Sequence, residues 1–375
     1  MAVYKNLVFK GGGVRGVAYV GAMEYFYREG YMRSVERVAG TSAGAISACL
    51  VSLNFNDFES LKAVADTLDY SKVPGKKAPK KGKDGRLEPD EGLDGDLDGE
   101  KKLSQVLLAQ VKEMSSNLSQ NVRYLTRFFQ DKGWYSSDYL YNWFKASIAR
   151  QFSVSKDSYT FADFRNPLIH VGNRKFLDLY ITGTDISNRS SRVFSFETTP
   201  DMEVAMAVRI SMSIPLFFEA VSYQYPGTDK PQTYVDGGIM LNYPVGIFDD
   251  AKYCRKLQRG INPETLGFFL YSSPEDTKYK EILNMIDYGG ALFDTLLTVQ
   301  EQLVFGSEKN KGRTVFIDDK GVSYDDFSVK TDDGKYTMLY RSGLTATEDF
   351  FANRSNWEQM VSKFQNRFGW RGMGN

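Results

Sequence analysis

One serine in this chain has the surroundings of a nucleophile. Ser42 is the central residue of a GxSxG pentapeptide, Gly40-Thr41-Ser42-Ala43-Gly44. Glycines at these positions let a chain turn sharply, so the serine hydroxyl stands clear of the backbone. An apolar run precedes the pentapeptide, and a run of small residues follows it. The pattern predicts a reactive hydroxyl on a tight turn between a strand and a helix. We call residues 40–44 the elbow.

A glycine-rich turn near the N-terminus offers groups that acyl transfer needs. It comprises Gly11, Gly12, Gly13, Arg15 and Gly16, and we call it the glycine loop. Free N–H groups at the start of a helix bind anions, including the negative oxygen of a tetrahedral intermediate. The loop is therefore a candidate oxyanion hole, to which Arg15 adds positive charge. The structural alternative is that these glycines only permit close packing of a strand and a helix.

The glycine loop also fits a weaker pattern. Gly11, Gly13 and Gly16 satisfy GxGxxG, and Glu36 lies near the acidic position of a dinucleotide-binding motif. However, the next predicted strand runs directly into the elbow, and no GK[ST] follows the glycines. These features favour an oxyanion site over a nucleotide site.

A serine nucleophile needs a group that takes its proton, and the sequence offers two candidates. His170 is the single histidine, and it lies in an apolar run, residues 167–171, that is typical of a strand. Asp236 follows an apolar run and precedes Gly237 and Gly238, which leave space around its carboxylate. A simple turn is the structural alternative for this segment. We favour a Ser42–Asp236 dyad over a histidine-based mechanism.

The motifs GGGVRG, GTSAG and DGG, in this order and context, resemble the patatin-like phospholipase family. Residues 207–215 and Asn242-Tyr243-Pro244 resemble the segments that surround the dyad in that family. Residues 315–351 resemble its C-terminal end. The resemblance therefore covers most of the chain.

The resemblance implies an α/β fold, namely a patatin-like variant of the α/β-hydrolase architecture with a central, mostly parallel sheet flanked by helices. It implies hydrolysis of acyl esters of membrane phospholipids or other acyl lipids, of the phospholipase A or lysophospholipase type, without metal or cofactor. Ser42 would be the nucleophile and Asp236 its partner, with the glycine loop as the oxyanion site. A hydrolase of non-lipid esters or thioesters, and an inactive membrane- or nucleotide-binding module, remain as alternatives.

A chain of 375 residues could hold two domains or one large α/β domain with insertions, and we expect a single patatin-like catalytic domain over residues 1–375. Strand-like and helix-like runs alternate over the first fifty residues, as in parallel sheets. Further strands are expected at 176–183, 193–196, 219–225 and 266–271, and helices within 103–152 and at 202–212 and 279–306. Two further segments are a charged, flexible insertion over 72–102 and an amphipathic C-terminal helix over 345–368.

Composition limits the partners of this protein. Basic and acidic residues number 47 each, so the net charge gives no reason to expect nucleic acid binding. Cys49 and Cys254 lie in apolar contexts that indicate free thiols. An EF-hand-like start at residues 94–99 lacks its bidentate Glu, which favours an acidic linker. We expect a cytoplasmic, peripherally membrane-associated protein without a signal peptide or transmembrane segment; the sequence gives no information on an activator or on oligomeric state.

Overall fold

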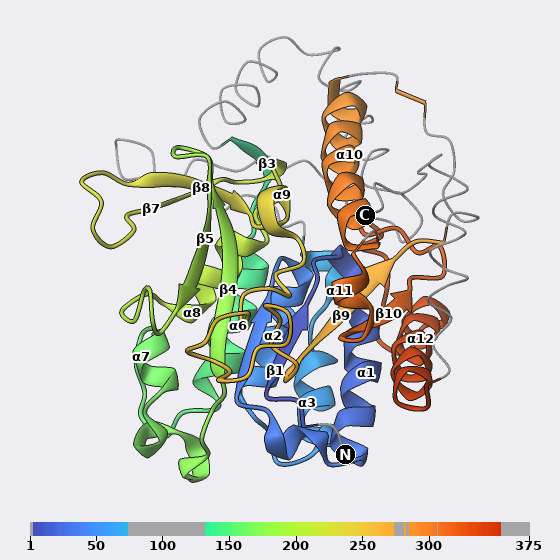
Figure 1. The fold of residues 1–375 in the computed structure, drawn as a ribbon. Coiled ribbons are helices and arrows are strands. Elements are labelled where there is room, and N and C mark those ends of the chain that lie inside the picture. The colour runs from blue at the N-terminus through green and yellow to red at the C-terminus, as the bar shows by residue number, and fades with distance from the viewer. Residues whose placement is uncertain (1–2, 74–131, 274–280, 283–284, 306, 354–375) are drawn as a thin grey trace.

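The computed structural model describes residues 3–73, 132–273, 281–282, 285–305 and 307–353 (Figure 1). A central sheet runs in the spatial order β10-β9-β1-β2-β4-β8-β7, with β5 also paired to β4. The bounds of these strands are β1 (Asn6–Phe9), β2 (Arg37–Gly40), β4 (Asp178–Asp185), β5 (Ser190–Ser195), β7 (Val221–Tyr223), β8 (Gln232–Asp236), β9 (Thr265–Tyr271) and β10 (Thr314–Asp318). From β10 to β4 all neighbours are parallel, whereas β5, β7 and β8 pair antiparallel. The expected α/β class with a mostly parallel sheet is confirmed.

Helices pack on this sheet, as Figure 1 shows. The α-helices are α1 (Val17–Arg28), α2 (Ala43–Ser52), α3 (Phe58–Ala65), α6 (Asp138–Ala149), α7 (Phe161–Phe164), α8 (Val204–Ser211), α9 (Gly238–Leu241), α10 (Met285–Phe305), α11 (Glu308–Lys311) and α12 (Gly334–Phe351). The 3-10 turns are η1 (Gly13–Gly16), η2 (Tyr31–Ser34), η3 (Tyr70–Lys72), η4 (Pro167–Ile169) and η5 (Val171–Asn173). A small separate sheet pairs β3 (Gly133–Tyr135) with β6 (Leu216–Phe218).

Alternation along the central strands divides the core between the two faces of the sheet. On β1, Leu7 and Phe9 join the large cluster that includes residues of α1, α2, α8 and α12. Val8 lies between them and faces the smaller cluster, to which Phe248 and Phe305 contribute. Because the central strands are covered on both faces, they read as continuous apolar runs.

Helices α1 and α12 lie so close together that each needs a glycine. A Cβ placed on Gly343 of α12 would lie 1.8 Å from the Ala18 carbonyl oxygen of α1. A Cβ on Gly21 of α1 would lie 1.9 Å from the Tyr340 carbonyl oxygen. This reciprocal contact fixes α12 against the first βα unit, beside the glycine loop.

The observed C-terminal helix differs from the expected one over 345–368. Helix α12 begins at Gly334, where the Asp333 carboxylate accepts a hydrogen bond from the Tyr336 N–H and caps the helix. The first part of α12 buries Tyr336 and Leu339 and lies before the apolar cluster used for the prediction, which begins at Ala346, so the early start was missed. The helix ends at Phe351, and residues 354–375 lie outside the described residues.

Two other local predictions are also wrong. Residues 167–169 form the 3-10 turn η4 instead of a strand, because Asn166 accepts a hydrogen bond from the Leu168 N–H and Pro167 fixes the first φ of the turn. Residues 133–135, expected within a helical stretch, form strand β3 beside β6. The predicted insertion over 72–102 lies outside the described residues except for Lys72 and Val73, and so does most of the helical stretch before residue 132.

Two properties of the described part of the chain concern cysteine and hydropathy. Cys49 and Cys254 are both buried free thiols, as expected. Among the described helices, none combines the length and apolar character that crossing a membrane requires.

The close approach of α1 and α12 makes a prediction about stability. Gly343→Ala should lower the free energy of unfolding by about 2–4 kcal/mol, because the new methyl group meets a backbone oxygen that cannot rotate away. Gly334→Ala is the matched control in the same helix, since a Cβ there meets nothing within 4 Å. Denaturant unfolding of both variants provides the measurement. Equal stability of the two variants would contradict the tight contact.

Candidate active site

The elbow holds Ser42 in a backbone conformation that most residues avoid. Its φ and ψ are 52° and −124°, between the end of β2 and the start of α2. The turn is narrow enough that a Cβ on Gly40 would lie 2.0 Å from the Gly44 carbonyl oxygen. A Cβ on Gly44 would lie 2.2 Å from the Phe9 carbonyl oxygen of β1. The two glycines thus permit a strained serine whose hydroxyl points away from the helix axis.

The register of three strands brings Asp236 to this serine. Gly40, the last residue of β2, pairs with Ile181 of β4. Two residues further along β4, Gly183 pairs with Asp236, the last residue of the antiparallel strand β8. Because β8 runs antiparallel to β4, its last residue, Asp236, lies level with the position two residues after Gly40. That position is Ser42.

The side chains of Ser42 and Asp236 form a direct hydrogen bond. The Ser42 hydroxyl donates to Asp236 Oδ2 over 2.7 Å, and the Gly238 N–H donates to Oδ1 over 2.6 Å. Asp236 is 1% exposed, and burial raises the pKa of its carboxyl group to about 7, although both hydrogen bonds oppose that shift. A buried carboxylate with a pKa near neutrality is well matched to proton transfer.

The glycine loop lies next to the elbow, in a conformation that depends on its glycines. Gly13 has a φ of +59°, and a Cβ there would lie 1.9 Å from the Tyr324 carbonyl oxygen. A Cβ on Gly11 would lie 3.2 Å from the Cβ of Ser42, and its N–H donates to the Asn242 carbonyl oxygen over 3.0 Å. Of the loop N–H groups proposed as oxyanion donors, that of Gly11 is therefore already engaged with the backbone.

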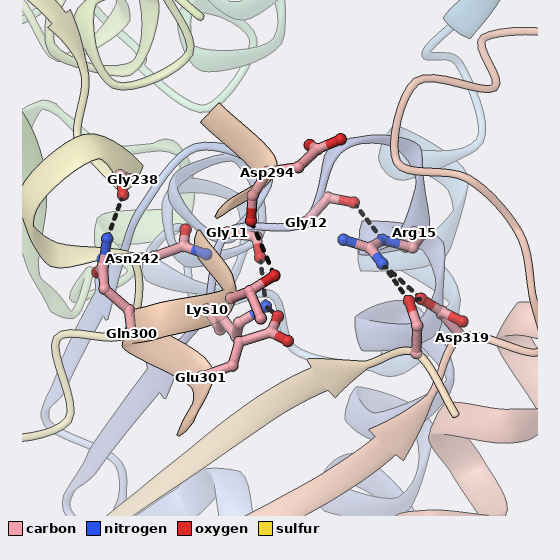
Figure 2. A network of polar contacts seen from close by, with 12 residues as sticks. Lys10, Gly11, Gly12, Arg15, Gly238, Asn242, Asp294, Gln300, Glu301 and Asp319 are labelled. Atoms are coloured by element: carbon pink, nitrogen blue, oxygen red, sulfur yellow. Dashed lines mark hydrogen bonds and ion pairs between the residues drawn. The ribbon is translucent and has the colours of Figure 1, made fainter. Parts of the chain in front are cut away.

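Two buried cations orient the peptide planes of the loop (Figure 2). Lys10 Nζ donates to the Gly11 carbonyl oxygen over 3.4 Å, and Arg15 Nε donates to the Gly12 carbonyl oxygen over 2.9 Å. In a trans peptide the N–H points opposite to the C=O. The N–H groups of Gly12 and Gly13 therefore point away from these cations, and no partner for either is found among the described residues.

Each cation is neutralised by its own acid. Lys10 Nζ lies 2.8 Å from Glu301 Oε1 of α10, and burial lowers the pKa of Lys10 while Glu301 opposes the shift. Arg15 pairs with the buried Asp319, which also accepts from the Ser272 hydroxyl over 2.5 Å. Arg15 is thus placed to orient the loop, with its charge directed at Asp319.

Comparison with known proteins shows the family of this chain. The sequence model of the patatin-like phospholipase family matches residues 7–249, a segment that contains the glycine loop, the elbow and Asp236. The chain belongs to the patatin-like phospholipase family.

Two proteins of similar sequence and one solved structure of similar fold can be named. The uncharacterized protein YqhO of Bacillus subtilis (strain 168) is 27% identical over 296 residues, covering 78% of this chain and 80% of that protein. The probable lipid hydrolase 463L of Invertebrate iridescent virus 6 is 21% identical over 244 residues, covering 65% of this chain and 63% of that protein. The crystal structure of VipD from Legionella pneumophila has a similar fold, with a TM-score of 0.51 at 15% identity, covering 94% of this chain and 67% of VipD.

Further side chains of this patatin-like site were not singled out from the sequence. The Ser42 N–H donates to Ser211 Oγ of α8 over 2.9 Å, and the Asp236 N–H donates to the Ser213 carbonyl oxygen over 2.8 Å. Gln300 of α10 donates to the Gly238 carbonyl oxygen and accepts from the Asn242 N–H, both over 2.8 Å. Ser211 lies in a segment that carries the family resemblance, whereas no sequence signal marks Gln300.

His170 occupies a different environment in the patatin-like fold. It is buried, with Nδ1 2.7 Å from the Arg174 carbonyl oxygen and Nε2 2.9 Å from the Asp163 carbonyl oxygen. Its ring stacks on Phe176 at a centroid distance of 3.7 Å. Both ring nitrogens therefore face backbone carbonyl groups, and His170 is not among the hydrogen-bond partners of Ser42 or Asp236.

The raised pKa of Asp236 predicts a pH-dependent cost in stability. Because the folded-state pKa of about 7 exceeds the unfolded value of about 4, wild-type stability should fall as pH rises from about 4 to 7. Asp236→Asn removes this cost and should be more stable than wild type by roughly 2–4 kcal/mol at pH 8, with little difference at pH 4. Denaturant unfolding of both proteins at several pH values provides the measurement. A difference that does not vary with pH would contradict the assignment.

Proposed function

We propose that this protein hydrolyses fatty-acyl esters of phospholipids, as a phospholipase A or lysophospholipase, with Ser42 as nucleophile and Asp236 as general base. The observation that carries the proposal is the 2.7 Å hydrogen bond from the Ser42 hydroxyl to a buried carboxylate. Membership of a phospholipase family and the name of the viral relative support a lipid substrate. The expected location, peripheral at a membrane on its cytoplasmic side, belongs to the same proposal.

In the first half of the reaction, Ser42 Oγ attacks the ester carbonyl carbon while its proton passes to Asp236 Oδ2. Negative charge develops on the carbonyl oxygen, where preorganised N–H donors are effective. The N–H groups of Gly12 and Gly13 are the proposed donors, and Lys10 and Arg15 orient them through the carbonyl groups of the preceding peptides. The N–H of Ala43, the residue after the nucleophile, is a further candidate.

The intermediate then collapses with cleavage of the ester C–O bond. Asp236 returns the proton to the leaving alcohol, and the fatty-acyl group remains on Ser42 Oγ as an ester. In the second half, a water molecule attacks this acyl ester and gives its proton to Asp236. The bond between the acyl carbon and Ser42 Oγ then breaks, Asp236 returns the proton to Ser42 Oγ, and release of the fatty acid leaves the hydroxyl and the carboxylate as they were.

A carboxylate acts here without histidine because burial raises its basicity. A carboxyl group with an ordinary pKa of about 4 would be a weak base for a serine hydroxyl at neutral pH. The raised pKa of Asp236 makes its carboxylate a stronger base for the serine hydroxyl. Activity should therefore require ionised Asp236 and increase with pH through about 7.

Substitution of the dyad separates the two candidate bases. Asp236→Asn and Ser42→Ala should each lower turnover of a phospholipid by about 10³-fold or more, because each removes a group that reacts. His170→Gln, corrected for the fraction of folded protein, should remain within about threefold of wild type, since its ring contacts only the core. Turnover is measured on lysophospholipid and phospholipid, with mass spectrometry of the products.

Labelling with a fluorophosphonate gives an independent check on the nucleophile. The probe should modify Ser42 in the folded wild type and leave Ser42→Ala unlabelled. An intact protein whose Ser42 never reacts would remove the enzyme proposal, and a loss in His170→Gln equal to that in Asp236→Asn would move the base to His170.

The contact between α8 and the elbow predicts a smaller effect. Ser211→Ala should reduce kcat by about tenfold, because the Ser42 N–H loses its buried acceptor and the elbow loses its fixed orientation. Ser213→Ala is the matched control, since within the described part of the chain its hydroxyl bonds only the Arg209 carbonyl oxygen, while the backbone carbonyl that holds Asp236 remains. Steady-state kinetics with one soluble ester compare the two. A kcat of Ser211→Ala equal to that of the control would exclude the positioning role.

A further inference from the structure

Helix α10 exposes an apolar stripe along its length. Its members are Tyr288, Leu292, Leu296, Val299 and Leu303, which we call the α10 stripe. They follow one another at intervals of four, four, three and four residues, so they share one helix face. Each is between 48% and 66% exposed. A contiguous apolar surface of this kind is typical of an interaction site.

Three polar side chains of α10, those of Asp294, Gln300 and Glu301, bond groups of the protein outside the helix. Glu301 pairs with the buried Lys10, and Gln300 bonds the turn after Asp236. Asp294 bonds the Tyr324 hydroxyl and, with burial as the larger cause, contributes to raising the pKa of that group. An ordinary surface helix buries its apolar face and exposes its charged face. Helix α10 departs from this pattern: it buries Phe305 but exposes the stripe, while polar groups of α10 hold the glycine loop and the Asp236 turn.

Helix α10, which carries the stripe, is therefore hydrogen-bonded to the candidate active site. Gln300 joins α10 to Gly238, two residues after Asp236, and Lys10 joins it to the first residue of the glycine loop. Figure 1 shows α10 projecting from the edge of the sheet beyond the ends of β1 and β2. A surface bound by the stripe would lie on the same side of the molecule as Ser42.

We propose that the α10 stripe docks this protein on a lipid surface. The proposal rests on the proposed function, since a hydrolase of water-insoluble acyl lipids must work at an interface that can cover apolar side chains. The stripe carries no charged residue. Its attachment therefore depends on apolar insertion among the head groups, and anionic lipid contributes little.

The proposal makes a prediction that does not depend on turnover. In the full chain carrying Ser42→Ala, the further change L292Q/L296Q/L303Q should weaken binding to phosphatidylcholine vesicles by about tenfold or more, because glutamine keeps the helix but loses the transfer free energy of leucine. Leu168→Gln is the control, since Leu168 is 79% exposed on η4, which follows α7 at the other end of the molecule (Figure 1). Vesicle cosedimentation measures binding, and thermal unfolding confirms that each variant is folded.

Three outcomes would overturn the proposal. The first is equal vesicle binding by the stripe variant and the Leu168→Gln control. The second is binding that appears only with phosphatidylserine and disappears at high salt, because that behaviour indicates charge instead of apolar insertion. The third is absence of vesicle binding together with concentration-dependent dimerisation that the stripe variant abolishes, which would make the stripe an interface between copies of this chain. Failure of the proposed function would appear separately, as absence of ester turnover by wild-type protein that still binds vesicles.

Discussion

Burial of the Asp236 carboxylate, with no neighbouring cation among the described residues, is the constraint on which this candidate site depends. Asp236 has two hydrogen-bond donors, Ser42 and the Gly238 N–H, and burial outweighs both in raising its pKa. A free cation beside it would lower that pKa and weaken the base. The two buried cations nearby are each paired with a separate acid, Lys10 with Glu301 and Arg15 with Asp319. The two cations therefore order the peptide planes of the glycine loop, and the pKa of Asp236 stays raised.

Separate helices hold the two residues of the proposed dyad in place. The elbow is held from α8 through Ser211, and the Asp236 turn is held from α10 through Gln300. Positioning groups on regular helices fix a geometry more narrowly than groups on loops. Polar side chains of α10 are used for this purpose, while Phe305 joins the core and the α10 stripe remains at the surface.

The sequence predicted the parts of the site that lie on tight turns. Gly40, Gly44 and Gly13 are required by close backbone approaches or a positive φ, so they leave a signal in the residue types themselves. The strands around them were recognised because burial on both faces gives continuous apolar runs. Gln300, Glu301 and Asp319 left no such signal, because their partners lie 62 to 304 positions away. The start of α12 and the turn at 167–169 were missed because a single capping side chain decided each of them.

The position of β4 between β2 and β8 has a consequence for folding. Ser42 and Asp236 are 194 positions apart, and their strands, β2 and β8, do not pair with each other but lie on either side of β4 and pair with its opposite ends. Contacts of such long sequence separation form late in folding. A newly made chain therefore carries no assembled proton acceptor for its serine until β4 and β8 have both joined the sheet. Under the proposed mechanism, incompletely folded chains would not react with esters, so reactivity toward an ester would mark a fully folded chain.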